Sequence, residues 1–224
     1  MSRKIVIVDY HKGNLLSVVR SLGEAGGDVV VSDDPAQIAV ADAVVLPGVG
    51  AFADAMDYIR SSGEDEAMLA AVDRGVPFLG ICLGLQLLFD RGDEGVEAPA
   101  GAPEEETWCA GLGILRGSAT RLVSSRLKVP HVGWDQIHLT DHGRACPMLA
   151  GVTAGAHVYF THSYAMDADV DDAVVATRTH YVRSFASTVW KDNVYGMQYH
   201  PEKSSREGLL MLENFVRIVE GGLA

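Results

Sequence analysis

Short hydrophobic runs alternate with longer amphipathic stretches over the first 90 residues of this chain. Four runs rich in β-branched residues predict strands, at Lys4–Val8, Val29–Val31, Ala43–Leu46 and Val76–Ile81. Apolar residues at helical spacing predict helices over Leu15–Ala25 and from about Ala51 onward. Strands that recur through helices form a mostly parallel sheet covered by helices. The pattern therefore predicts an α/β fold.

The second half of the chain has further strand-like runs with few helical stretches between them. They predict antiparallel strands added beside the parallel core, at Ile114–Leu115, Ala119–Val123, His157–Phe160, Val174–Thr177, Phe185–Trp190 and Val194–Gln198. The preceding segment, residues 91–111, is acidic and lacks a periodic apolar face, which predicts a solvated loop or insertion. No repeat or linker divides the chain, so we expect a single domain over residues 1–224.

The last helix has the clearest predicted start. Residues 204–207, with the sequence SSRE, match a capping box. Apolar residues then follow at helical spacing, namely Leu209, Leu212, Val216 and Val219. We expect this stripe to pack on the sheet.

Composition and charge narrow the possible functions. Of the 224 residues, 48% are hydrophobic, which predicts a globular protein with a substantial core. The net charge of −12 and the lack of a basic run argue against a nucleic-acid binder. No apolar run reaches the length of about 18 residues that a membrane span needs, nor is there a signal sequence, so we expect a cytoplasmic protein. The cysteines Cys82, Cys109 and Cys146 form no metal-ligand or disulfide pattern, and we expect no metal and no cofactor.

Cys82 lies where a buried strand turns into an apolar helix. Gly80 and Gly84 flank it in a G-x-C-x-G pattern, the cysteine version of a nucleophile elbow, in which glycine permits a tight turn. A helix that starts at the sulfur favours thiolate, and the N–H of Leu83 could point at a developing oxyanion. The alternative is an ordinary buried cysteine.

A candidate base for this thiol is His200. It follows the strand predicted at Val194–Gln198 and precedes Pro201, which favours extended backbone at His200. Side chains two positions apart in extended backbone point the same way, so Glu202 would lie beside His200 and could hold its imidazole. The alternative is a strand end with a surface charge. Together, the elbow and the His-x-Glu pair meet the demands of acyl transfer.

A second glycine-bearing turn, LPGVGAF at residues 46–52, ends another predicted parallel strand. Parallel sheets place their sites at this carboxyl edge, so the turn's backbone amides could supply another oxyanion donor. A phosphate-binding loop is disfavoured, because no Lys-Ser/Thr pair follows and no GxGxxG is present.

These motifs together resemble the class I (triad type) glutamine amidotransferases, which have a flavodoxin-like α/β fold. The resemblance is carried by GICLGLQLL around Cys82, PGVGAF around Val49 and QYHPEKS around His200, and it spans nearly the whole chain. Within the family, three segments resemble the glutaminase subunits of imidazole glycerol phosphate synthases of histidine biosynthesis: VDYHKGNLLSV at the start, PHVGWDQI at 130–137 and YFTHSYA at 159–165.

The resemblance implies a role for each matching residue. Cys82 would attack the carboxamide of glutamine, His200 would move the proton and Glu202 would orient His200. The implied oxyanion hole consists of Gly48, Val49 and Leu83, and a reorientation of the Gly48–Val49 peptide could be needed to complete it. The implied glutamine contacts are Gln86, His162, Ser163 and Tyr164. The implied partner is a (β/α)8-barrel cyclase subunit that receives the ammonia, and the residues expected to face it are Asn14, Val132, Trp134 and Lys203.

Two positions in the expected interface depart from the family pattern. Position 135 is Asp where many relatives carry Asn, and position 132 is Val where many carry Met. These departures leave the triad intact and bear on the coupling between subunits. Trp134 alone could instead be a core aromatic. Three other functions stay open: the glutaminase subunit of another synthase such as anthranilate synthase, a γ-glutamyl hydrolase, or a non-enzymatic module with a redox-sensitive thiol.

Overall fold

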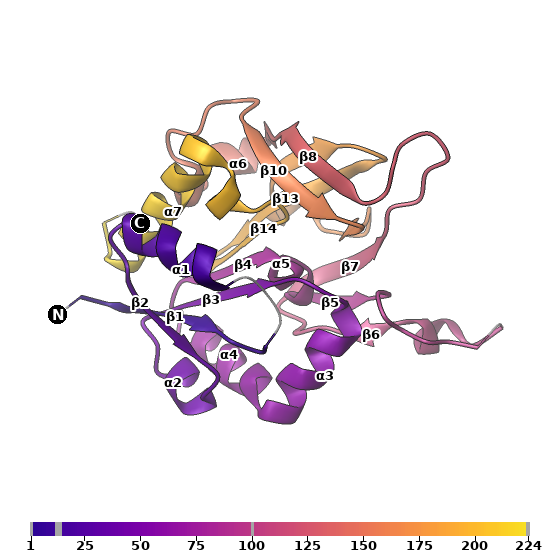
Figure 1. Cartoon of the computed structure of the whole chain (residues 1–224), viewed down its shortest axis with the longest axis horizontal. Helices are drawn as coiled ribbons and strands as arrows, with labels where there is room; N and C mark the ends of the chain where they lie inside the picture. The colour runs from indigo at the N-terminus through magenta and orange to yellow at the C-terminus, as the bar shows by residue number, and fades with distance from the viewer. Residues whose placement is uncertain (1, 12–14, 100, 223–224) are drawn as a thin grey trace.

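A computed structural model describes residues 2–11, 15–99 and 101–222. Its centre is an eight-stranded sheet in the order β2-β1-β3-β4-β14-β13-β12-β9 (Figure 1). The first five strands are parallel: β2 (Asp28–Ser32), β1 (Lys4–Val8), β3 (Ala43–Gly48), β4 (Phe78–Cys82) and β14 (Val194–Met197). The others are antiparallel: β13 (Ser184–Lys191), β12 (Val175–His180) and β9 (His138–Leu139). The predicted α/β fold with added antiparallel strands is confirmed.

Helices cover both faces of the parallel strands. On one face lie α1 (Leu15–Glu24) and α7 (Ser205–Val219); on the other lie α2 (Pro35–Ala39), α3 (Phe52–Ser62) and α4 (Glu64–Asp73) (Figure 1). Alternate residues of β1 serve the two faces, since Ile5 and Ile7 belong to one core cluster and Val6 and Val8 to the other. Each face therefore has its own hydrophobic core. Every helix in the described part of the chain is too short or too polar to span a lipid bilayer.

Two smaller sheets lie beside the main one. One pairs β8 (His131–Gln136) with β10 (His157–His162). The other contains β11 (Tyr164–Met166), β7 (Leu115–Arg121), β5 (Phe89–Gly92) and β6 (Cys109–Ala110). The remaining elements are α5 (Leu83–Leu87), α6 (Asp141–Arg144) and 3-10 turns at Glu104–Thr107, Pro147–Leu149, Asp172–Val174 and Pro201–Lys203.

Two predictions about the second half of the chain need correction. Segment 91–111 is not wholly a loop, because its ends pair as strands β5 and β6; the part between them projects from the body of the protein (Figure 1). The runs at 114–115 and 119–123 form one strand, β7, because backbone pairing with β5 and β11 continues across the polar residues between them. Strand β8 was not predicted.

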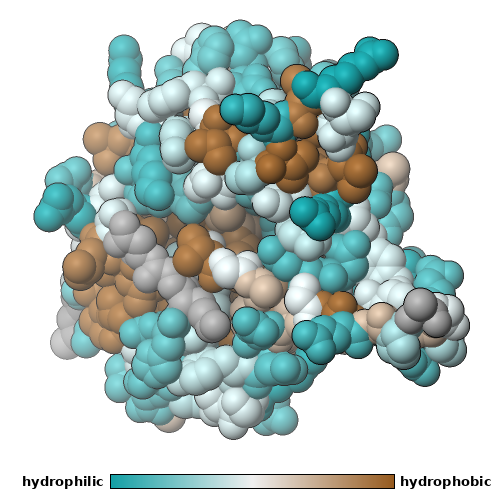
Figure 2. Space-filling view, turned by 45° about the vertical axis from the view of Figure 1, so that its right-hand side comes forward, coloured by the Kyte–Doolittle hydropathy of each residue, from teal (hydrophilic) through white to brown (hydrophobic). Residues whose placement is uncertain are grey.

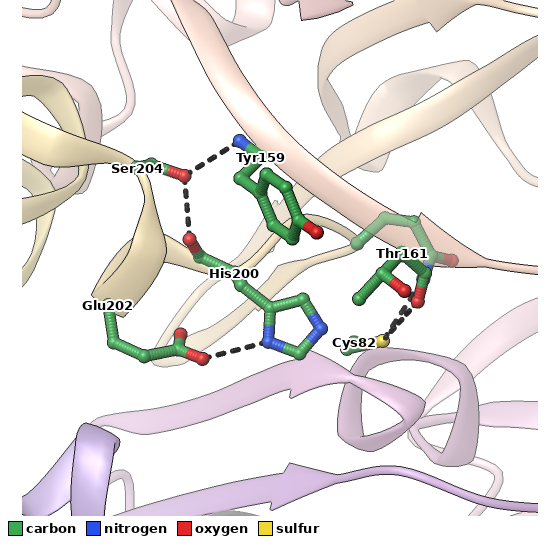
Figure 3. Close-up of polar contacts among 7 residues, drawn as sticks. Cys82, Tyr159, Thr161, His200, Glu202 and Ser204 are labelled. Carbon is green, nitrogen blue, oxygen red and sulfur yellow. Dashed lines mark hydrogen bonds and ion pairs between the residues drawn. The ribbon is translucent and has the colours of Figure 1, made fainter. Parts of the chain in front are cut away.

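The predicted capping box at the start of α7 is wrong. The Ser204 hydroxyl donates to the carbonyl of His200 (2.6 Å) and accepts from the N–H of Tyr159 (2.9 Å) instead of capping the helix (Figure 3). The Glu207 carboxylate accepts from the N–H and hydroxyl of Thr153. Three residues of the predicted stripe are buried, but Leu209 is only partly buried. These tertiary contacts tie the helix start to the segment that carries His200.

Candidate active site

Two neighbouring parallel strands bring Cys82 and His200 to one edge of the sheet. Strand β4 ends at Cys82, and β14 pairs with it so that Ile81 lies opposite Met197. Three residues beyond β14, the N–H of His200 donates to the carbonyl of Tyr159 in β10 (2.9 Å). Both side chains therefore lie at the carboxyl edge, where open parallel sheets place their sites.

The backbone at Cys82 has the strained geometry of a nucleophile elbow. Its φ of 57° and ψ of −109° lie in a region that residues other than glycine rarely adopt. The flanking glycines permit close backbone approach, since a Cβ at Gly84 would lie 1.7 Å from the carbonyl oxygen of Leu46 and one at Gly80 would lie 2.6 Å from that of Gly84. Helix α5 begins at the next residue, Leu83.

His200 and Glu202 form a buried pair beside the thiol. Imidazole Nδ1 lies 2.8 Å from Glu202 Oε1, and both side chains are almost completely buried. The other ring nitrogen, Nε2, points toward the sulfur of Cys82 (Figure 3) and has no hydrogen-bond partner among the described residues. Burial alone would lower the pKa of His200, but Cys82 and Glu202 raise it to about 10. The ring can therefore hold a proton next to the sulfur at neutral pH.

A cavity of about 370 Å³ opens beside Cys82. Its walls include six of the residues expected to bind or polarise glutamine: Val49, Leu83, Gln86, His162, Ser163 and Tyr164. Gly48 instead lines a smaller cavity that also touches His200, Glu202 and Lys203. A Cβ at Gly48 would lie 1.7 Å from the Tyr10 hydroxyl oxygen, so only glycine fits there. The structure thus brings the predicted substrate contacts to one place.

Hydrogen bonds behind the cavity hold its wall. The Gln86 amide nitrogen donates to the carbonyl of Tyr164 and to Gln198 Oε1, both at 3.0 Å. The Gln198 amide nitrogen in turn lies 3.8 Å from the sulfur of Cys82. Nδ1 of His162 lies 2.7 Å from the same Tyr164 carbonyl, and burial lowers the pKa of His162 to about 3. His162 is therefore neutral at physiological pH and brings no charge to the cavity.

Glu94, which no sequence pattern indicated as a site residue, also lines the cavity. Burial raises its pKa to about 7, although the N–H of Phe52 opposes this effect. Glu94 lies in the acidic segment expected to be a solvated loop, and nothing in the sequence distinguishes it from the other carboxylates there. A single carboxylate in this cavity can pair with a substrate ammonium group. Among the described residues, no cluster of three or more His, Cys, Asp or Glu side chains could hold a metal ion.

Most residues expected to face a partner are exposed. On β8, Val132 is 56% exposed and Trp134 is 52% exposed, so the reading of Trp134 as a core aromatic is wrong. Lys203 is also exposed, with Nζ 5.9 Å from the ring centroid of Tyr159. Figure 2 shows two apolar areas on this side of the molecule, one on its upper part and one at its lower left. Asn14 lies outside the described residues.

Comparison with known proteins gives matches over almost the whole chain. The family model for class-I glutamine amidotransferases matches residues 6–219. The imidazole glycerol phosphate synthase subunit HisH of Moorella thermoacetica is 44% identical over 217 residues, which cover 97% of this chain and 96% of that protein. The subunit of the same name from Syntrophotalea carbinolica is 45% identical, covering 94% of this chain and 98% of the relative.

Solved structures show the same fold at low sequence identity. A chain of PurLQS from Thermotoga maritima superposes with a TM-score of 0.66 at 17% identity, covering 96% of this chain and 98% of the other. The glutaminase domain of Trypanosoma brucei CTPS, with bound acivicin, has a TM-score of 0.66 at 14% identity, with 98% and 94% covered.

Proposed function

Because the chain belongs to the class-I glutamine amidotransferase family, we propose that it is the glutaminase subunit of an imidazole glycerol phosphate synthase. It hydrolyses glutamine to glutamate and ammonia, and a (β/α)8-barrel cyclase subunit uses the ammonia in histidine biosynthesis. It works in the cytoplasm as one domain over residues 1–224. The observation that carries the proposal is the pairing of His200 with Glu202 at 2.8 Å, at the same sheet edge as the elbow thiol Cys82.

The reaction proceeds through a thioester. The Cys82 thiolate attacks the side-chain carboxamide carbon of glutamine and forms a tetrahedral oxyanion. As this intermediate collapses, the C–N bond breaks and His200 Nε2 donates a proton to the departing ammonia. Water then attacks the thioester and gives a proton to His200, and glutamate leaves as the thiolate reforms. Glu202 holds the ring through Nδ1 and stabilises its charged form.

Backbone and carboxylate groups bind the rest of the substrate. The N–H of Leu83, first in its helix, stabilises the oxyanion, and the Gly48–Val49 peptide contributes a second donor after it reorients. Glu94 pairs with the α-ammonium group of glutamine, and the wall formed by residues 162–164, together with Gln86, faces its amino-acid end. The cavity thereby positions the carboxamide against the sulfur of Cys82.

The partner binds at the apolar face of β8. Val132 and Trp134 offer exposed apolar surface near the site, and Asn14 and Lys203 are expected to lie at the same interface. A half-exposed tryptophan beside apolar neighbours is typical of protein interfaces. The relatives named HisH favour this partner over that of anthranilate synthase or a free hydrolase. A thiol-sensing module would not need the buried His-Glu pair.

The test is a glutamine hydrolysis assay with and without the cyclase partner and its nucleotide ligand. We expect slow hydrolysis by the chain alone and a large increase in the complex. Cys82→Ser should abolish hydrolysis in both states, while Cys109→Ser, at a half-buried thiol outside the cavity, should not. Full activity without a partner would contradict the proposed dependence on a cyclase, and unchanged activity of Cys82→Ser would contradict the whole mechanism.

A further inference from the structure

A chain of side-chain contacts runs behind the cavity, beginning at Asp135 on the face of β8 that also carries the buried His131. The Asp135 carboxylate, whose side chain is 33% exposed, lies 3.4 Å from Nε2 of His131. Nδ1 of His131 lies 3.2 Å from Nε2 of His162. Nδ1 of His162 lies 2.7 Å from the carbonyl of Tyr164. Two buried imidazoles therefore connect a surface carboxylate to the wall of the cavity.

The same chain continues to the nucleophile. The Tyr164 carbonyl also accepts from the Gln86 amide, which donates in addition to Gln198. The Gln198 amide nitrogen lies 3.8 Å from Cys82 Sγ. The side chains between the two ends are buried, and His131 is stacked between the rings of Phe160 and Tyr181, at 4.8 and 3.9 Å. Packing thus fixes the plane of His131 and, with it, the direction of both ring nitrogens.

Counting protons shows that the neutral chain is incomplete. Three contacts join Asp135, His131, His162 and the carbonyl of Tyr164, and each contact needs one proton. The carbonyl and the carboxylate at the two ends can only accept, and two neutral imidazoles supply two protons. Either the imidazole pair carries a third proton and a positive charge, or one contact has none.

Burial decides between these two states. It lowers the pKa of His162 to about 3, and it lowers the pKa of His131 more strongly than Asp135 raises it. The other titratable groups that act on the pair are His200 and Arg183, which disfavour a further positive charge at His162, and the phenol of Tyr181. At neutral pH the pair is uncharged. The contact without a proton is then the longest one, between Asp135 and His131.

We propose that His131 is a positioning residue of the glutamine site. We further propose that Asp135 weakens the contact of His131 with His162, because the carboxylate places a second hydrogen-bond acceptor against the unprotonated Nε2 of His131. The proposal rests on the glutaminase function inferred above. Nδ1–H of His131 fixes the tautomer of His162, which holds the Tyr164 carbonyl and thereby Gln86. A group at position 135 that donates a hydrogen bond to Nε2 of His131 would complete the chain without burying a charge.

Two variants in the complex with the cyclase test this. Asp135→Asn offers an amide N–H to His131 and should lower the KM for glutamine about threefold at pH 7.5, with kcat unchanged. His131→Phe keeps the stacking but removes both nitrogens, and should reduce kcat/KM about 3- to 30-fold. Asp141→Asn, an exposed position with the same charge change, should have no effect. A wild-type KM in both test variants would overturn the proposal.

Ring-nitrogen NMR of the full chain supplies a readout that does not depend on activity. With 15N-labelled histidine, His131 and His162 should both be neutral and protonated on Nδ1 at pH 7.5. In Asp135→Asn, His131 should lose the stabilisation of its charged form, so its pKa should fall further. An unchanged His131 pKa, or a proton on Nε2 of His162, would overturn the proposal. If the wild-type complex fails to hydrolyse glutamine, the proposed function fails while this spectrum still tests the network.

Discussion

Neutralising Glu94 should weaken glutamine binding far more than it slows the chemistry. The carboxylate lines the cavity beside Cys82, and we infer that it pairs with the α-ammonium group, distant from the bond that breaks. A charge-assisted hydrogen bond of this kind contributes about 1.5–3 kcal/mol. Glu94→Gln should therefore raise KM about 10- to 150-fold, with kcat changed less than about threefold. The change removes an interaction made equally in the ground state and the transition state.

The same contact predicts how KM should change with pH. Burial raises the pKa of Glu94 to about 7, so the empty cavity loses its negative charge as the pH falls through 7. Only the ionised form attracts the ammonium group, and KM should rise about tenfold for each pH unit well below 7. Glu94→Gln should remove this dependence.

The assay measures initial rates of glutamate release by the complex from pH 5.5 to 8.5. Glu97→Gln, at an exposed position three residues along the same segment, is the matched control and should behave like the wild type. A Glu94→Gln variant with kcat lowered by the full factor at unchanged KM would refute the ammonium contact, because the carboxylate would then act on the transition state alone.

Three further substitutions test the site and the core. Glu202→Gln should lower kcat by about 10³–10⁴ at similar KM, because an amide no longer stabilises the imidazolium; a loss below tenfold in the same assay would exclude an orienting role. Gly84→Ala should lower the free energy of unfolding, measured in urea, by more than about 3 kcal/mol, since the added Cβ would overlap the carbonyl of Leu46. Gly23→Ala is the control, because a Cβ at Gly23 would meet no atom, and it should be tolerated. Glu64→Gln should stabilise the chain by about 2 kcal/mol at pH 8 and by little at pH 5. Burial raises the pKa of Glu64 to about 7, so the folded state bears the cost of ionising this carboxyl group only at higher pH, and solvent screens part of that cost. Equal effects at both pH values would contradict this expectation.

The parallel half of the fold could be predicted because its strands are buried on both faces. Strand β1 sends Ile5 and Ile7 to one core and Val6 and Val8 to the other, so its whole run is apolar. Strand β8 has the opposite pattern. It buries His131 and exposes Val132 and Trp134, and no hydrophobic periodicity marks such a strand as part of the core. If its apolar side is a partner surface, its pattern makes sense only in the complex.

The candidate site divides in the same way. Local sequence signals identified Cys82, through its flanking glycines, and His200 with Glu202, through the intervening proline. Glu94 carried no local signal, and Gln198, although it begins the QYHPEKS segment, was not identified as a site residue, because their places depend on contacts between distant segments. The predicted capping box was wrong for the same reason, because the Ser204 hydroxyl links the carbonyl of His200 to the backbone of β10 instead of capping the helix.

The position of β14 has a consequence for how the protein is made. This strand is the last one among the described residues, yet it inserts in the middle of the main sheet, between β4 and β13. A ribosome releases the segment with the thiol more than one hundred residues before the segment with the imidazole. The nascent chain therefore cannot consume glutamine until the segment with His200 has been made and inserted, and a product truncated before it would carry an inert cysteine.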